Sequence, residues 1–271
     1  MRATVKSLLV RIVTCLALAI ALPPAARAQD LLQYFDLTTD EFTKSDMTRA
    51  EIEAALAKLP DGETLDLAGK RLNKLDLSGM DLSRTKLNAA RINGCNFRSA
   101  NFSGVSLDSA WALKSDFTGA KFIGASLFQT QMMDAKLDGA DFSNAMVGAD
   151  MSRASLVDAR FQDAMLAPDL TNQSMGLMRG VLKSAKLDGA SFNGANLKRS
   201  AFDFASLRGA DFEGADLEGA ELSGADLTGA NVTDANFDKA DLNGTKLLGL
   251  RGRDRAKGFD TAVNRDKAVF D

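Results

Sequence analysis

The chain has 271 residues, of which 45% are hydrophobic and 25% are charged, and its formal net charge is −3. This length and composition are typical of a folded globular protein of one or two domains, not of a disordered chain. The absence of histidine excludes serine–histidine and cysteine–histidine nucleophile pairs and the commonest zinc sites, and two cysteines cannot form a four-thiolate cluster. Catalysis by carboxylates alone stays open.

Residues 1–28 have the pattern of a secretory signal peptide. The start is basic, residues 8–22 are mainly apolar, and the Ala-Arg-Ala triplet at 26–28 matches an A-x-A cleavage site. We therefore expect cleavage after Ala28 and a periplasmic or secreted mature chain. An uncleaved membrane anchor is the alternative, although the apolar run is short for a membrane span. Cleavage would remove four basic and no acidic residues, which changes the net charge from −3 to −7.

Residues 29–62 are expected to form an N-terminal segment that includes one capping helix. Thr48 and Glu51 have the spacing of a capping box, and the helix predicted over residues 48–59 ends at a Pro-Asp-Gly sequence. Its apolar side chains fall on one stripe, formed by Ile52, Leu56 and Leu59. We expect this stripe to lie over the first coil of the repeat that follows.

Residues 63–252 are dominated by a repeat with a period of five. An apolar residue recurs at every fifth position from Leu67 to Val147, and the same spacing returns over residues 151–166 and 182–247. A small residue stands two positions before most of these apolar centres, and glycine often closes the unit. Neither the period of a helix nor that of a strand explains this pattern, which favours short extended pieces joined by tight turns.

The units Ala-Asp-Leu-Glu-Gly (215–219), Ala-Asp-Leu-Thr-Gly (225–229) and Ala-Asn-Leu-Lys-Arg (195–199) resemble those of the pentapeptide-repeat family. The resemblance covers roughly residues 65–250. It implies an all-β fold, a right-handed quadrilateral parallel β-helix of about nine coils, each of about 20 residues. At a strand spacing of about 4.8 Å the rod would be about 43 Å long. Cys95 falls at a small inward position, which predicts a core filler.

The repeat is interrupted at two places. Residues 145–148 make a four-residue unit, and residues 167–181 contain Pro168 and lose the alanine pattern. The second interruption predicts a projecting loop, interpreted either as a neutral insertion or as a functional element. Residues 253–271 are expected to form a C-terminal cap, with a short helix that buries Val263, Val269 and Phe270 against the last coil.

One face of the predicted rod carries a candidate interaction patch. Residues twenty positions apart should stack on one face, and this places the only tryptophan outward, within reach of a cation–π contact with Arg91. Tryptophan and arginine are favoured anchors of protein interfaces. The alternative is that the tryptophan simply lies over a neighbouring coil. The patch consists of Arg71, Arg91, Trp111, Leu113, Lys114 and Met133.

Charge is unevenly distributed along the rod. Residues 70–98 carry seven basic and two acidic residues, whereas residues 203–241 carry ten acidic and two basic ones. Such a field can steer a charged partner, or it can be an ordinary solvated surface. The second stretch predicts an acidic surface made of Asp211, Glu213, Asp216, Glu218, Glu221 and Asp226.

The sequence predicts no catalytic, metal or cofactor site, because it contains no P-loop, dinucleotide fingerprint, zinc spacing or nucleophile elbow. We expect a non-catalytic exported scaffold or interaction module whose partner is another protein. Nucleic acid is not an expected partner, no cofactor is expected, and no transmembrane segment is expected once the signal peptide is removed.

Two other functions stay open. Some members of the family that the chain resembles mimic DNA by shape and negative charge, and they bind DNA gyrase or topoisomerase to give quinolone tolerance. The acidic second half fits this alternative, whereas the signal peptide opposes it because gyrase is cytoplasmic. The third possibility is a carboxylate-dependent hydrolase of envelope polymers, which would need two nearby carboxyls in a cleft.

Overall fold

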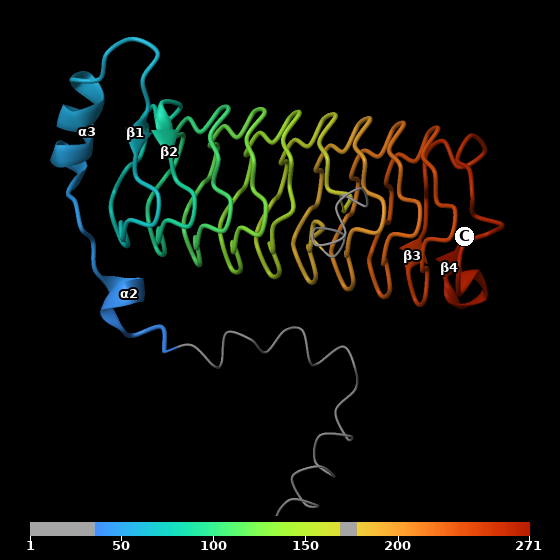
Figure 1. Cartoon of the computed structure of the whole chain (residues 1–271). Coiled ribbons are helices and arrows are strands. Elements are labelled where there is room, and N and C mark those ends of the chain that lie inside the picture. Colours follow the sequence, from blue (N-terminus) through green and yellow to red (C-terminus); the bar gives the residue numbers. More distant parts are fainter. Residues whose placement is uncertain (1–35, 169–177) are drawn as a thin grey trace, which may run out of the picture. The chain divides into compact units, whose positions relative to one another are not determined.

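The computed structural model describes residues 36–168 and 178–271, so the predicted signal peptide lies outside the described residues. The chain divides into two units, Met1–Asp40 and Glu41–Asp271. In the described part of the first unit, the Asp36 carboxylate accepts hydrogen bonds from the backbone N and the Oγ1 of Thr38, at 2.9 and 2.6 Å. The second unit contains the whole repeat, and its coils stack into a rod (Figure 1).

Regular elements are short throughout the described chain, because each turn of the repeat interrupts the extended backbone after a few residues. The elements are α2 (Asp40–Thr43), α3 (Arg49–Ala57), β1 (Leu65–Asp66), β2 (Thr85–Lys86), β3 (Lys246–Leu247), the 3-10 turn η3 (Arg265–Lys267) and β4 (Val269–Phe270).

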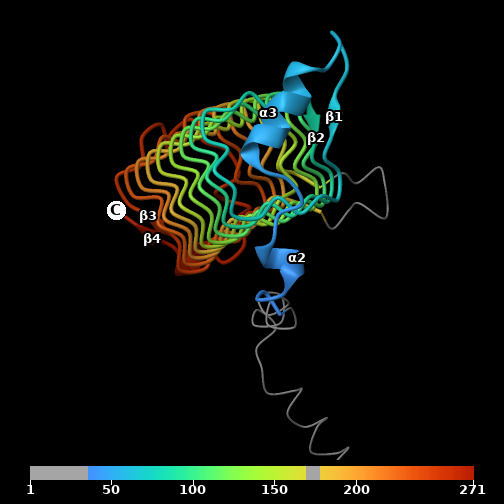
Figure 2. The same cartoon turned by 90° about the vertical axis from the view of Figure 1, so that its left-hand side faces the viewer.

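Parallel pairing between successive coils defines the architecture. β1 pairs in parallel with β2, and β3 pairs in parallel with β4. Between these pairs the coils are joined by isolated parallel bridges, most of whose partners are twenty residues apart, as in Arg71↔Arg91. Seen toward its N-terminal end, the rod shows its coils nested one behind another (Figure 2). The second unit is therefore a parallel β-solenoid, as the repeat predicts.

Each coil has four faces, which are numbered here by the bridges that they contain. Face 1 contains Arg71↔Arg91, face 2 Asp76↔Asn96, face 3 Asp81↔Asn101 and face 4 Ser106↔Ser126. A corner separates each face from the next. Many corners are closed by a residue with positive φ, which is glycine in about half of the units and a polar residue in most of the others.

The core consists of the apolar centres and the small residues that precede them. On face 3 six successive centres are phenylalanines, and their rings stack in parallel with centroids 4.7 to 5.0 Å apart. This separation matches the spacing of about 4.8 Å between paired strands, so ring stacking and backbone pairing are satisfied together. The stacked rings are Phe102, Phe122, Phe142, Phe161, Phe192 and Phe212.

Cys95 is a core residue, as predicted. Its side chain is buried among the small inward residues, and no disulfide involves it. Burial raises the pKa of the Cys95 thiol to about 12. The thiol therefore stays protonated at neutral pH, where a thiolate nucleophile would be needed for reactivity.

The two interruptions fall at the same corner of the rod, between face 4 and face 1. Met146 pairs twenty residues back with Ser126, but Asp150 pairs nineteen residues back with Gln131, which confirms the four-residue unit. One coil later Val181 pairs with Asp150, thirty-one residues away, so the coil accommodates eleven additional residues. Most of the loop predicted there, residues 169–177, lies outside the described residues.

The helix α3 and its capping box are present where the sequence predicts them. The Thr48 side chain accepts a hydrogen bond from the Glu51 backbone N, and the Glu51 carboxylate accepts one from the Thr48 backbone N. Ile52 of α3 is fully buried and belongs to the same core as Leu67 and Leu72. Within the described residues, no helix combines the length and the apolar character that crossing a membrane requires.

The C-terminal segment differs from the expected helix. It forms only the 3-10 turn η3, and β4 continues the ladder of face 2. Val263 and Val269 are 50% and 47% exposed instead of buried, because both stand at outward bridging positions. The inward positions are taken by Ala262, Ala268 and Phe270. The helix prediction was wrong because parallel pairing with the preceding coil continues as far as β4, through units of six residues instead of five.

Replacing Phe142 by alanine should lower the free energy of unfolding by about 3–5 kcal/mol, because it removes a fully buried ring from the middle of the face 3 stack. Urea denaturation monitored by circular dichroism measures the change. The control is Phe204→Ala, which truncates a ring that is 68% exposed and should cost less than about 1 kcal/mol. Equal losses in both variants would contradict the stacked core.

Candidate functional site

Residues 41–47 lie across face 1, and we call this segment the strap. Ser45 forms an antiparallel bridge with Leu72, and the Asp46 backbone N donates to the Arg71 carbonyl oxygen at 2.6 Å. The Asp46 carboxylate accepts hydrogen bonds from the backbone N, the Nε and the Nη2 of Arg71, at 2.9, 3.0 and 2.6 Å. The hydrogen bonds from Arg71 lower the pKa of the Asp46 carboxyl.

The strap continues over the next two coils. Glu41 forms an ion pair with Arg91, with Oε1 and Nε 2.8 Å apart. The Phe42 ring lies 5.3 Å from the Trp111 ring, centroid to centroid, at an interplanar angle of 58°. The Arg91 guanidinium lies 5.3 Å from the same Trp111 ring, which confirms the predicted cation–π contact. The strap therefore contacts three successive coils of face 1.

A ladder of buried amides supports the strap from below. The Asn73 Nδ2 donates to the carbonyl oxygens of Glu41 and Lys44, at 3.0 and 2.8 Å. The Asn73 Oδ1 accepts from the backbone N and the Nδ2 of Asn93, and the Asn93 Oδ1 accepts from the Leu113 backbone N. Both side chains are buried with their hydrogen bonds formed, so they fix the strap instead of destabilising the core.

These contacts change the interpretation of the predicted patch. Arg71, Arg91 and Trp111 are on face 1 as expected, but each is in contact with the strap. Leu113 and Met133 were expected to point outward, yet they are only 6% and 7% exposed. Lys114 is exposed at the adjoining corner. Counting twenty residues per coil assigns a residue to the correct face, but it cannot show which other segment covers that face. The sequence did contain one sign that this face is covered: positions 113 and 133 carry apolar side chains, whereas the equivalent positions of most other coils carry polar ones.

The predicted acidic residues do not form one surface. They belong to one coil and are distributed around it, with Asp211 and Glu213 on face 3, Asp216 and Glu218 on face 4, and one residue each on faces 1 and 2. Asp216 and Glu218 pair with Lys198, Glu221 with Arg179 and Lys183, and Asp226 with Arg208 and Lys246. Wrapping the chain around the rod disperses a charge cluster that is compact only in the sequence.

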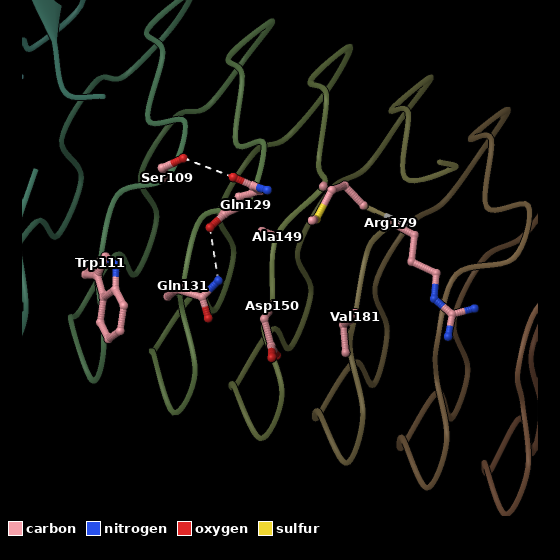
Figure 3. A pocket seen from close by; sticks show the side chains of 10 residues that line it. Ser109, Trp111, Gln129, Gln131, Ala149, Asp150, Arg179 and Val181 are labelled. Carbon is pink, nitrogen blue, oxygen red and sulfur yellow. Dashed lines mark hydrogen bonds between the residues drawn. The ribbon is translucent and has the colours of Figure 1, made fainter. Parts of the chain in front are cut away.

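A pocket of about 340 Å³ lies on face 1 beyond the strap, beside the corner where the repeat is interrupted. Regular units fill this corner with a residue of positive φ, such as Ser109 or Gln129. The four-residue unit lacks that residue, and Gly148 follows its centre directly, so the surface is hollowed there. Sequence reasoning identified the short unit but did not identify a pocket beside it. The side chains that line the pocket include Trp111, Gln129, Gln131, Asp150, Arg179 and Val181 (Figure 3).

Polar groups in the pocket are partly engaged with one another. The Ser109 Oγ donates to the Gln129 Oε1 at 3.2 Å, and the Gln131 Nε2 donates to the Gln129 carbonyl oxygen at 3.0 Å (Figure 3). Arg179 donates to the Arg199 carbonyl oxygen and forms an ion pair with Glu221 at 2.7 Å. Figure 3 shows the Arg179 side chain extending along the rod, away from Trp111.

The carboxyl groups give no sign of an acid–base pair in the described part of the chain. Asp150 is the single carboxyl that lines the pocket. Burial favours the neutral form of Asp141, but hydrogen bonds from Ser143 and the Arg160 guanidinium outweigh burial and lower its pKa. Every other described carboxyl with a shifted pKa is also shifted downward. A general acid needs the opposite shift.

The match to a family model agrees with this architecture. The family model for pentapeptide repeats matches residues 66–104, 115–147, 134–167, 181–214 and 205–244. HetL, a pentapeptide repeat protein involved in heterocyst differentiation regulation in the cyanobacterium Nostoc sp. strain PCC 7120, is 25% identical over 82% of this chain and 94% of its own, with a TM-score of 0.38.

Two further solved structures are similar at lower identity or coverage. A trypsin-treated form of QnrB1, a plasmid-mediated fluoroquinolone resistance protein, is 21% identical over 73% of this chain and 91% of its own, with a TM-score of 0.43. A pentapeptide repeat protein from the thylakoid lumen of Arabidopsis thaliana is 24% identical over 56% of this chain and 70% of its own, with a TM-score of 0.14. No curated protein matches the chain.

Acidification should release the strap. The pKa of Asp46 is lower in the folded chain, so its contribution to strap docking is complete above the unfolded pKa of about 3.9 and is lost as the pH falls through the lower folded value. We expect the emission of Trp111, the only tryptophan, to shift to longer wavelength below about pH 4 while the far-ultraviolet circular dichroism is unchanged. Asp46→Asn should show the shifted emission already at neutral pH. Wild-type emission that does not change on acidification, or a variant with wild-type emission at neutral pH, would contradict this role of Asp46.

Proposed function

The chain belongs to the pentapeptide-repeat family, and from this premise we propose that it is an exported, non-catalytic module that binds another protein through the outer surface of its solenoid. The inward half of each repeat is occupied by the core, which leaves only outward positions for function. The observation that carries the proposal is a pair of exposed methionines on face 4, in the middle of the rod.

The outward positions of face 4 are polar in the neighbouring coils, where Ser126 and Asn196 stand. Between them Met146 and Met165 occupy the same positions on successive coils and are 58% and 47% exposed. The Asn196 Nδ2 lies 3.2 Å from the Met165 sulfur. Phe128, which follows the face 4 centre of the preceding coil, lies next to Gly148. The fold requires no apolar residue at these outward positions, so the exposure of the two methionine side chains supports a contact with a partner.

Methionine suits such a contact because its side chain is flexible and polarizable, so it can adapt to the shape of an apolar partner surface. The pair borders the corner where the repeat is interrupted, so the apolar patch and the irregular backbone occur together. In contrast, the described strap already covers much of the patch around Arg71 and Trp111. Face 4 is therefore the surface that we assign to the partner.

Export of the chain rests on the sequence of residues 1–28 and is part of the same proposal. A mature chain beginning at Gln29 would contain one cysteine, so its stability outside the cytoplasm would depend on packing and not on an internal disulfide. We assign to α3 the role of covering the first coil. In support, Ile52 is fully buried, and the Arg49 Nη1 donates to the carbonyl oxygens of Asp76 and Ser78 at 3.3 and 3.2 Å.

Replacing both methionines by aspartate should abolish partner binding without unfolding the rod. In affinity capture from envelope extract, we expect proteins retained by the wild type to be lost from the Met146→Asp, Met165→Asp variant, because a charge at each position would have to be desolvated in the contact. The matched control is Ile123→Asp, which changes a residue that is 40% exposed on face 3. Retention of the same proteins by all three forms would contradict the assignment of face 4.

Export is tested by fractionating cells that produce the full chain. We expect the protein in the periplasm or the medium with Gln29 as its first residue, because the A-x-A site directs cleavage after Ala28. Replacing Ala28 by a bulky residue such as Phe should block processing and leave the longer chain at the membrane. An uncut chain found only in the cytoplasm of wild-type cells would overturn the exported assignment.

A further inference from the structure

We propose that the pocket on face 1 binds a saccharide of one or two sugar rings. This site is separate from the methionine pair on face 4, and the inference does not depend on the protein partner proposed above. It rests on the lining of the pocket by an aromatic ring, two carboxamides and one carboxylate from successive coils (Figure 3).

The apolar side of the pocket suits the C–H face of a pyranose ring. Trp111 lies at one end and Val181 at the other, with Gly148 and Ala149 between them. A sugar ring presents carbon-bound hydrogens on its faces and hydroxyls around its rim, so it combines with an aromatic side chain and polar neighbours. The volume of about 340 Å³ lies at the lower end of the range of about 300–1,000 Å³ for small-molecule sites.

The polar groups offer both donors and acceptors. The Gln129 side-chain amide nitrogen and the Gln131 side-chain amide oxygen have no hydrogen-bond partner among the described residues. The other atom of each amide group is already bonded: the Gln129 Oε1 accepts from Ser109, and the Gln131 Nε2 donates to the Gln129 carbonyl oxygen. The Asp150 Oδ1 accepts from the Ser152 backbone N at 2.9 Å, which leaves its Oδ2 to accept another bond. Vicinal hydroxyls donate and accept at once, and carboxamides and carboxylates match them in this respect.

The backbone of the short unit supplies further donors. In regular units the backbone N–H at the closing corner bonds to a neighbouring coil, as from Gln129 to the Gly148 carbonyl oxygen at 2.9 Å. The N–H groups of Gly148 and Ala149 donate to no acceptor in the described chain, and both residues line the pocket. A ligand with hydroxyl or carbonyl oxygens would supply the acceptors that these two groups lack.

The charge of the site favours a neutral ligand. Arg179 is already ion-paired with Glu221 and bonded to a carbonyl oxygen, so it is not placed to neutralise a phosphate. The remaining charge on the lining is that of Asp150, which would repel an anion. A nucleotide or a phosphorylated ligand is therefore a poor match for this pocket, and a neutral polyol is a good one.

A peptide is also a poorer match than a saccharide. An extended peptide is recognised mainly by adding a strand to a free sheet edge. On face 1 beside the pocket, Gln131, Asp150 and Val181 are already paired in parallel with neighbouring coils, so the backbone there offers no free edge.

The test uses the full chain and the fluorescence of Trp111, which is the only tryptophan and lines the pocket. Cellobiose, maltose and N,N′-diacetylchitobiose are each titrated, and isothermal titration calorimetry is run in parallel. We expect a saturable change in emission and a saturable heat with at least one of them. Gln131→Ala should weaken that binding about tenfold or more, because it removes one carboxamide from the site.

The matched control is Gln162→Ala, which removes an exposed glutamine of face 3 in the same region of the rod and should leave binding unchanged. Gln129→Ala provides a second pocket variant if Gln131→Ala does not fold, as judged by circular dichroism. No saturable signal with any of the three sugars, or an equal loss in Gln162→Ala, would overturn the proposal. Trialanine is titrated in the same way, and its binding without binding of any sugar would overturn the proposal in favour of a peptide site.

Discussion

The structure depends on one geometric agreement: parallel backbone pairing and inward side-chain stacking repeat at the same distance along the rod. Each coil places its apolar centres above those of the coil before it, and the ring separations on face 3 are 4.7 to 5.0 Å. Backbone pairing between strands sets a spacing of about 4.8 Å. Because both ladders share this spacing, each coil is stabilised by its neighbours alone, and stability accumulates along the chain.

The same agreement restricts where the chain can vary. Inward positions must stay apolar or small, and the corner residues must adopt turn conformations, so variation is confined to outward side chains and to changes in unit length. The four-residue unit and the eleven-residue insertion both fall between face 4 and face 1, on successive coils. The shortened unit hollows the surface at Gly148 and leaves two backbone donors without acceptors there. The exposed methionines border the same corner, so the features that support binding occur together.

The strap shows how a solenoid face can be recognised. Its contacts combine an ion pair from Glu41, an aromatic contact from Phe42 and an ion pair from Asp46, all made with side chains on successive coils. The Asp46 Oδ1 accepts from both the Nε and the Nη2 of Arg71. Buried Asn73 links the strap backbone to the amide ladder below it. A partner at another face would meet the same regular rows of side chains, about 4.8 Å apart along the rod. Selectivity for one partner then depends on which side chains occupy equivalent outward positions of successive coils, as Met146 and Met165 do on face 4.

The sequence by itself indicated the solenoid, because a five-residue period of apolar centres is incompatible with helix and strand periods. The resemblance to the pentapeptide-repeat family then implied four units in each coil, and this places each residue on a definite face. It also determined the α3 capping box at Thr48 and Glu51, the four-residue unit at 145–148, the inward position of Cys95 and the contact of Arg91 with Trp111. All of these follow from local pattern or from counting by twenties.

Only the tertiary structure decided what covers or adjoins each face. It showed that the strap crosses face 1 and that Leu113 and Met133 are buried. It also showed the pocket beside Gly148 and the outward positions of Val263 and Val269. The physical reason is that these features depend on contacts between segments outside the repeat register, or on the path of the chain around the rod, and neither is encoded in a local period.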